Sequence, residues 1–515
     1  MGNYWHSIAY FFRLPFFLQW RTALVQIPRF VPLSVLHITS PKGPHPFLIS
    51  LPSRKDDLIY VYAFVPPNPV TLEGNSNAER ARKQTKEWHA PVVLDFHGGG
   101  FIMGSPLEQA PYASMMSREL GAIVLSVSYR IGPFHQFPAA IHDAEDVLSA
   151  ILDTDGISKA GKMLREEIQR YYSIVRTDAL KSDRKKKKKK HKEAIAPHLE
   201  YVETITLDPT RLSISGFSAG GNIALNMAIN VPPVPELGLT AAGRSPSIVR
   251  NSIAGDTSSP TLPKNRRATM LDDILQPWPS LLPPPRARPR MLPLLLFYPS
   301  LDARLLPHER PMKTLPNALH SDDKTSQKPK TPGLFSIMGP TYLPKKLRNH
   351  PRASPGLVEP SLIQKNAAIF LVLPEKDTLA VQSDVWVNVM NEHNWYGPTR
   401  FGDGREGDWD GQHGGSAGSV ATPSRENGGL EIWHAPNCRH GWTQFPDTFV
   451  PQHERSEREL VFARTLQFVK ENWQKELSFP DQGLEYRPTD LDPIKIPSRI
   501  NGLSEQSPVE GQKRV

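Results

Sequence analysis

Short apolar, β-branched runs recur along the chain, with longer amphipathic stretches between them. Runs of this length predict buried strands, and their alternation with helical patterns predicts a mostly parallel sheet with helices on both faces. The predicted strands are Leu58–Val65, Val92–Phe96, Ala122–Ser128, Leu212–Ser215, Leu294–Tyr298, Ala368–Leu373 and Leu430–His434. The predicted helices are Pro138–Ala150, Asn222–Asn230, Thr378–His393 and His453–Gln474. The pattern therefore predicts the α/β class.

Four segments interrupt this alternation with proline-rich, glycine-rich or highly charged sequence. They are residues 157–199, 231–290, 305–352 and 396–428. Such composition favours long insertions that are disordered or act as lids. We therefore expect an N-terminal segment over residues 1–50, one domain over 51–475 that contains the insertions, and a tail over 476–515.

Composition supports a globular core and limits the classes of partner. The 515 residues are 39% hydrophobic and 22% charged, which is enough apolar material for a folded domain. The net charge is +9, but the run from Lys181 to Lys192 alone carries +8, so the rest is nearly neutral. We interpret this run as a solvated loop, with a polyanion-binding patch as the alternative, and expect no specific nucleic-acid partner. The single cysteine, Cys438, excludes an intramolecular disulfide and argues against a disulfide-rich secreted protein.

The first 20 residues are unusually aromatic. They hold eight of the 44 aromatic residues, and the first acidic residue is Asp56. No stretch reaches the ~18 apolar residues of a membrane-spanning helix. Two interpretations remain open for residues 1–40: a segment that lies on a membrane surface, or a helical cap over an apolar site. We accordingly expect an intracellular protein that is cytoplasmic or peripherally associated with a membrane.

The strongest chemical signal is the pentapeptide Gly216-Phe217-Ser218-Ala219-Gly220, between a predicted strand and a predicted helix. A sharp strand-to-helix turn forces its central residue into a strained conformation, and the flanking glycines remove side chains that would clash. The turn places the Ser218 hydroxyl at a helix N-terminus, where developing negative charge is favoured. The pattern therefore indicates a nucleophilic serine.

A second signal lies upstream, where the strand Val92–Phe96 runs into His97-Gly98-Gly99-Gly100. Tandem glycines allow backbone N–H groups to point into a cavity, as an oxyanion hole requires. We expect Gly98, Gly99 and Gly100 to supply such donors together with Ala219, and His97 to brace the loop.

Together these two motifs resemble the α/β-hydrolase fold, and within it the hormone-sensitive-lipase-like branch of serine esterases. The stretch from Tyr129-Arg130 through Phe137-Pro138-Ala139-Ala140 to Asp143 also resembles that branch. The ending His440-Gly441-Trp442, followed by Gln444-Phe445-Pro446, is most similar to fungal members. One departure is Phe217, because many members carry an acidic residue at that position.

The resemblance orders the remaining groups as serine, acid and histidine along the chain. It implies His440 as the general base, with His434 as a rival that a strand would hold in place. Asp377, which follows the predicted strand Ala368–Leu373, matches the position of the family's acid. Asp302 and Glu375 are the alternatives for this role.

The expected activity is hydrolysis of a small or medium acyl ester or a lipid ester through an acyl-enzyme intermediate. The alternative is a non-catalytic ligand-binding protein on the same scaffold. No metal or organic cofactor is expected, because no His or Cys cluster has the spacing of a ligand set. The expected partners are a small-molecule ester and, through residues 1–40, a membrane surface.

Overall fold

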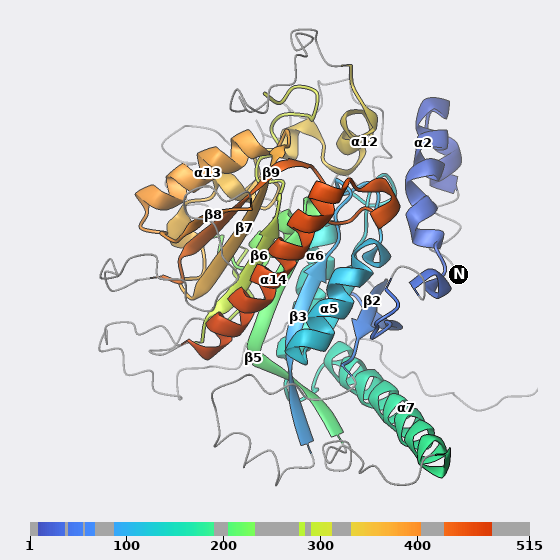
Figure 1. The fold of residues 1–515 in the computed structure, drawn as a ribbon. Helices are drawn as coiled ribbons and strands as arrows, with labels where there is room; N and C mark the ends of the chain where they lie inside the picture. The colour runs from blue at the N-terminus through green and yellow to red at the C-terminus, as the bar shows by residue number, and fades with distance from the viewer. Residues whose placement is uncertain are drawn as a thin grey trace, which may run out of the picture.

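A computed structural model describes residues 9–36, 40–54, 57–66, 87–189, 204–231, 278–283, 290–311, 331–402 and 427–475. In these ranges nine strands form a single sheet in the order β1-β2-β4-β3-β5-β6-β7-β9-β8 (Figure 1). The strands are β1 Phe47–Pro52, β2 Leu58–Phe64, β3 Glu87–Phe96, β4 Ile123–Ser128, β5 Thr204–Phe217, β6 Leu292–Phe297, β7 Ala367–Lys376, β8 Thr399–Phe401 and β9 Leu430–Arg439. β2 pairs antiparallel with β1 and β4, and all other neighbouring strands are parallel.

Helices cover both faces of this sheet, and successive residues of a strand face opposite layers. In β4, for example, Ile123 and Leu125 join one apolar cluster while Val124 joins the other. The first cluster includes residues of α6, α8 and α13, and the second includes residues of α5 and α14, which lie in front of the sheet in Figure 1. The helices are α2 Phe16–Gln26, α5 Ala110–Leu120, α6 Ala139–Leu152, α7 Lys159–Lys189, α8 Ala219–Met227, α12 Leu334–Tyr342, α13 Ala380–Glu392 and α14 Gln452–Gln474.

The predicted class is confirmed, and each predicted strand and helix overlaps an element of the structure. The structure adds two edge strands, β1 and β8, and the helices α2, α5, α7 and α12. It also extends β5 back to Thr204, so that this strand runs for 14 residues before the turn at Ser218.

The predicted disorder of the segment 157–199 is wrong over Lys159–Lys189, which form α7. Leu164, Ile168 and Tyr172 recur at four-residue spacing and are buried in the first cluster. This spacing aligns them on one helical face, and the intervening Glu, Gln, Lys and Arg residues are good helix formers. The lysine run therefore does not prevent helix formation, because the first half of α7 carries apolar residues that are buried against the core.

The other predicted insertions contain some regular structure. Segment 305–352 includes α12, and segment 396–428 includes β8. Residues 232–277, 284–289, 312–330 and 403–426 of the insertions lie outside the described residues, as does the tail 476–515.

The N-terminal segment forms α2, which packs along one side. Leu14, Leu18 and Val25 are buried in the first cluster, and α2 contacts α12. Its other side carries exposed aromatic residues. Within the described ranges, no helix combines the length and apolar character needed to cross a membrane.

Candidate active site

Ser218 stands at the turn between β5 and α8, with φ +55° and ψ −112°. For a residue other than glycine, such a conformation costs on the order of 1–3 kcal/mol. A Cβ on Gly220 would lie 2.0 Å from the carbonyl oxygen of Phe96, so only glycine permits this close approach of helix and strand. The N–H of Ser218 donates to the Phe297 carbonyl, and the N–H of Ser300 donates to the Ser218 carbonyl. Neighbouring β6 thus holds the turn that presents the hydroxyl.

His440 joins this hydroxyl to a buried carboxylate. Its Nε2 lies 2.9 Å from Ser218 Oγ, and its Nδ1 lies 2.7 Å from Asp377 Oδ2. Because a carboxylate can only accept, Nδ1 carries the proton and Nε2 is free to accept from the serine O–H. The other Asp377 oxygen accepts the N–H of Leu379 at 2.8 Å. The Asp377 side chain is 2% exposed and that of His440 is 38% exposed, so the chain runs from a buried acceptor to an accessible base.

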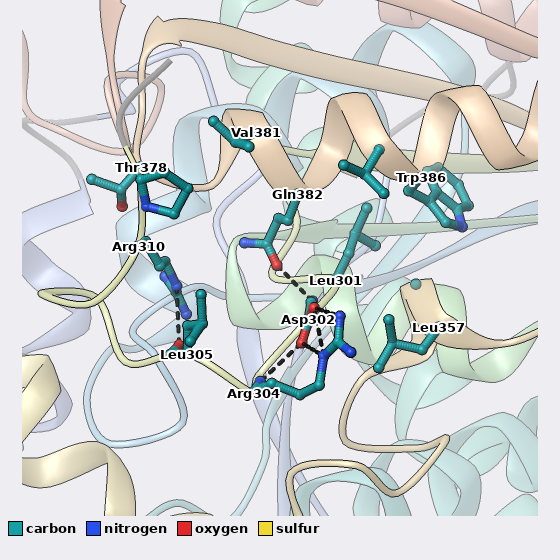
Figure 2. A pocket seen from close by; sticks show the side chains of 13 residues that line it. Leu301, Asp302, Arg304, Leu305, Arg310, Leu357, Thr378, Val381, Gln382 and Trp386 are labelled. Carbon is teal, nitrogen blue, oxygen red and sulfur yellow. Dashed lines mark hydrogen bonds and ion pairs between the residues drawn. The ribbon is translucent and has the colours of Figure 1, made fainter.

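The rival residues are engaged elsewhere. Asp302 forms a fork with Arg304, with atom distances of 2.7 and 3.0 Å (Figure 2). A carboxylate oxygen of Glu375 accepts the N–H of Asn437 at 3.1 Å. His434 lies within β9 and stacks on Phe401, with ring centroids 5.0 Å apart. Among these described candidates, Asp377 is the acid that the structure joins to His440.

The glycine loop, residues 97–104, begins where β3 ends. Gly99 has φ +109°, and a Cβ there would meet the Met103 carbonyl at 2.1 Å. The N–H groups of Ile102 and Met103 both donate to the Gly99 carbonyl, which closes the loop. Ala219 is the first residue of α8, so the predicted donors Gly98, Gly99, Gly100 and Ala219 lie at the ends of β3 and β5, which are neighbours in the sheet.

His97 supports the glycine loop through its ring and its backbone carbonyl. Its Nδ1 lies 2.7 Å from the Gly98 carbonyl, and its ring stacks on Tyr129 at 4.2 Å. The Tyr129 hydroxyl donates to the His97 carbonyl at 2.6 Å. Burial lowers the pKa of His97 to about 3, so the imidazole is neutral and donates from Nδ1. The His97 side chain therefore holds the backbone of the glycine loop in place and adds no charge to the site.

Aromatic rings fill the space behind the serine turn. Phe217 stacks on Phe297 at 4.3 Å and meets the edge of Tyr112 at 5.0 Å. Tyr298 packs against the His440 ring at 4.9 Å, and its hydroxyl lies 2.5 Å from Thr443 Oγ1. An apolar residue at position 217 is thus accommodated by packing, and Tyr298 supports the imidazole.

Cys438 is not a rival to Ser218 as the nucleophile. Cys438 is buried, and burial raises the pKa of its thiol far above the ordinary value, which disfavours the nucleophilic thiolate. Within the ranges that the structure describes, no group of three or more His, Cys, Asp or Glu side chains is placed to hold a metal ion.

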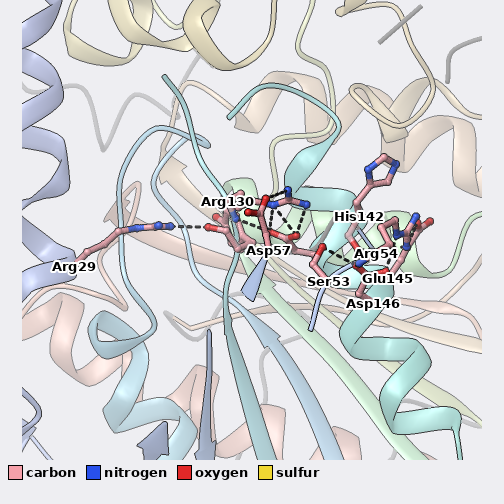
Figure 3. Close-up of polar contacts among 10 residues, drawn as sticks. Arg29, Ser53, Arg54, Asp57, Arg130, His142, Glu145 and Asp146 are labelled. Carbon is pink, nitrogen blue, oxygen red and sulfur yellow. Dashed lines mark hydrogen bonds and ion pairs between the residues drawn. The ribbon is translucent and has the colours of Figure 1, made fainter. Parts of the chain in front are cut away.

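Sequence patterns did not reveal the contacts that join the N-terminal segment to the glycine loop. Arg29 donates to the Tyr129 carbonyl at 2.6 Å and to the Gly104 carbonyl at 3.3 Å. The neighbouring Arg130 binds Asp143 at 2.7 Å and Asp57 at 3.0 Å (Figure 3). These hydrogen bonds and ion pairs hold the loop after β4 from both sides. Arg29 is one of three arginines among residues 1–40, and no motif distinguished it from Arg13 and Arg21.

A cavity of about 190 Å³ opens beside the acid, between α13 and the loop after β6 (Figure 2). Thr378, Trp386 and Leu301 contribute to its walls, and so does the side chain of Arg310, which is partly buried. Burial lowers the pKa of Arg310 to about 10, so it remains charged at neutral pH. Ser218, His440 and Asp377 do not line this cavity, which reaches the site only through Thr378, the residue after the acid.

Comparisons with known proteins agree with this geometry. Residues 93–242 match a family model described as the alpha/beta hydrolase fold. Carboxylesterase 20 of Arabidopsis thaliana is 36% identical over 91 residues, which cover 17% of this chain and 25% of that protein. An acetyl-hydrolase of Streptomyces hygroscopicus is 34% identical over 89 residues, which cover 17% of this chain and 29% of that protein. The chain thus spans less than a third of the length of these two relatives.

A solved structure is also similar. The hyperthermophilic esterase from the archaeon Pyrobaculum calidifontis aligns with a TM-score of 0.42 and 15% identity, over 85% of this chain and 90% of that chain. The sheet order, the strand–turn–helix geometry at Ser218 and the family match are mutually consistent. The chain therefore has the α/β-hydrolase fold, and its residues 93–242 match the family that carries this fold.

Proposed function

We propose that the protein is a serine-dependent carboxylic ester hydrolase. The observation that carries this proposal is the hydrogen-bonded chain from Ser218 through His440 to Asp377. A hydroxyl is a weak nucleophile at its ordinary pKa, and an adjacent base with an orienting carboxylate is the arrangement that activates it.

The steps follow from these contacts. His440 Nε2 takes the proton of Ser218 as Oγ attacks the ester carbonyl carbon, and the imidazolium that forms is stabilised by Asp377. The N–H groups of Gly98, Gly99, Gly100 and Ala219 stabilise the tetrahedral oxyanion. His440 then protonates the departing alcohol, which leaves an acyl-enzyme. Water, deprotonated by His440, attacks this ester, and the acid is released as Ser218 regains its proton.

The substrate class is inferred from the relatives and from the sequence around the base. The relatives named above are a carboxylesterase and an acetyl-hydrolase, which favours a small or medium acyl ester over other acyl compounds. The ending His440-Gly441-Trp442 with Gln444-Phe445-Pro446 favours a fungal-type member of the hormone-sensitive-lipase-like branch. Residues 1–40 are proposed to contact membranes peripherally, because α2 leaves aromatic side chains exposed.

A panel of esters of increasing acyl length tests the proposal, assayed with the wild type and with Ser218→Ala. The wild type should hydrolyse part of the panel, and Ser218→Ala none above background. Asp377→Asn should lower turnover by up to ~10⁴, because the imidazole would favour the wrong tautomer. Asp302→Asn is the matched control and should change little, since Asp302 pairs with Arg304. A folded wild type that binds an ester without turning it over would support the ligand-binding alternative.

A further inference from the structure

Two exposed phenylalanines border the proposed site on different elements. Phe335 of α12 lies against the glycine loop, because a Cβ on Gly100 would meet its ring at 2.7 Å. Phe445 lies beside the base, because a Cβ on Gly441 would meet its ring at 3.5 Å. Both side chains are exposed although they neighbour the reacting groups. Exposed apolar side chains therefore lie beside both the glycine loop and the loop that carries His440.

The N-terminal segment extends this apolar surface. It is tied to the glycine loop by the hydrogen bond from Arg29 to the Gly104 carbonyl, and α2 packs on α12. Figure 1 shows α2 standing beside α12, beyond the end of the sheet to which the parallel strands point. The segment and the two phenylalanines thus lie around one end of the molecule.

The exposed residues of this segment form a row distinct from its buried side. Leu14, Leu18 and Val25 face the core. The exposed row is Phe12, Phe16, Phe17, Trp20, Leu24, Ile27 and Phe30. Phe16 and Phe30 are 80% and 79% exposed, values that the hydrophobic effect opposes in water. A contiguous patch of this kind marks an interaction site more often than scattered surface residues do.

Charge identifies the partner. Residues 1–55 contain no Asp or Glu, whereas Arg13 and Arg21 lie within the aromatic row. The Arg21 guanidinium sits 4.2 Å above the Trp20 ring. Aromatic rings interleaved with cations suit the boundary between anionic headgroups and acyl chains, where a ring can insert and an arginine can bind phosphate.

We propose that these side chains form one lipid-docking face whose occupant is the surface of a bilayer containing anionic phospholipid. The face consists of the exposed row together with Phe335 and Phe445. Docking turns the surface beside the glycine loop and His440 toward the bilayer, so the substrates are esters held in that surface. The substrate part of this inference rests on the proposed ester hydrolysis, but the docking part does not.

The test uses full-length Ser218→Ala protein, so that hydrolysis cannot alter the vesicles. Flotation with vesicles of phosphatidylcholine alone and of phosphatidylcholine with 30% phosphatidylserine should show stronger binding to the anionic vesicles, weakened by salt. Adding Phe16→Gln and Phe30→Gln should lower binding by roughly tenfold or more, because two inserting rings are lost. The matched control is Ile157→Gln with Val385→Gln, two exposed apolar residues outside the face, and it should bind as the parent does.

Two results would overturn the docking face. One is equal vesicle binding by the Phe16/Phe30 variant, with its thermal unfolding midpoint intact. The other is no vesicle binding, together with dimers that the same two substitutions dissolve, which would make a second copy the occupant. Hydrolysis of a dispersed acetyl ester by the wild type is measured separately. If it persists without vesicle binding, only the docking face fails, and if it is absent while binding persists, only the proposed function fails.

Discussion

The backbone conformation and the surroundings of Gly99 disfavour any other residue at this position. Its φ of +109° is a conformation that side chains rarely adopt, and the Met103 carbonyl occupies the space of a Cβ. The same residue accepts two backbone hydrogen bonds that close the glycine loop. Local sequence was sufficient to single out this loop, because consecutive glycines after a strand have few other uses.

We predict that Gly99→Ala lowers turnover of a soluble ester by roughly 10²-fold or more. The added Cβ displaces the loop, so its N–H groups no longer point at the oxyanion. The matched control is Gly339→Ala in α12, where a Cβ would meet nothing within 4 Å. This control should leave turnover unchanged and alter the free energy of unfolding by no more than about 1 kcal/mol, the gain in helix propensity being offset by the following Pro340. Steady-state kinetics with thermal unfolding would check both, and a fully active Gly99→Ala would contradict the role of the loop.

A second prediction concerns Asp95, which is buried in β3 and accepts hydrogen bonds from Ser126 at 2.7 Å and Ser215 at 2.6 Å. Burial raises the pKa of Asp95 to about 6, despite the two hydroxyl donors. An aspartate in the unfolded chain loses its proton near pH 4. Between these values the folded state binds more protons, so this residue's contribution to stability falls as pH rises.

The wild type should therefore lose about 2 kcal/mol of unfolding free energy, relative to Asp95→Asn, between pH 4 and pH 7. Urea unfolding of both proteins at several pH values measures this difference. A difference that stays constant, or that grows in the wild type's favour with pH, would show that the buried carboxyl does not titrate as described.

At the scale of elements, α7 combines two different halves. Its first half buries Leu164, Ile168 and Tyr172, whereas its end enters the lysine run. Deleting Asp183–Lys192 should leave the unfolding midpoint and turnover unchanged and weaken only salt-sensitive binding to polyanions. Leu164→Ala in the same element should cost about 2–5 kcal/mol, as other buried leucines do. Loss of turnover in a folded deletion variant would instead make the run part of the site.

The contact between the N-terminal segment and the glycine loop gives another prediction at this scale. Arg29→Gln would remove donors from the Tyr129 and Gly104 carbonyls. We expect kcat for a dispersed ester to fall by roughly tenfold with little change in KM, because the loop is misplaced while the rest of the site remains. Arg29→Lys should recover part of the loss. The control is Arg170→Gln, which changes only a surface pair with Glu167. An Arg29→Gln variant with unaltered kcat would show that the contact is only structural.

The elements that sequence predicted are those with strong local patterns. Runs such as Val92–Phe96 are buried on both sides of the sheet and are apolar at every position except Asp95, so they were recognisable. β1 has an alternating burial pattern, but exposed Leu48 and terminal Pro52 obscured it. β8 is only three residues long and depends on its pairing with β9. In the first half of α7, apolar residues recur every four positions, but the adjacent lysine run favoured a prediction of disorder.

At the scale of the whole molecule, the site depends on long-range assembly. Ser218 and His440 are 222 positions apart, and His440 and Asp377 are 63 apart. The sheet places β5, β7 and β9 in parallel, so the loops after their carboxyl ends meet at one edge. Sequence could propose the three residues from motif and chain order. It could not choose among Asp377, Asp302 and Glu375 from the residues alone, because that choice depends on which loop reaches the imidazole.

Labelling with a fluorophosphonate probe tests the central claim most directly, because the probe needs both an activated hydroxyl and an oxyanion site. The wild type should be modified at Ser218, as located by peptide mass spectrometry. His440→Ala should abolish labelling at pH 7, since the hydroxyl would lack its base. The matched histidine control is His434→Ala, which removes a ring stacked on Phe401 and should leave labelling intact. A folded wild type that does not label, or labelling that persists in Ser218→Ala, would contradict the assignment of Ser218 as the nucleophile.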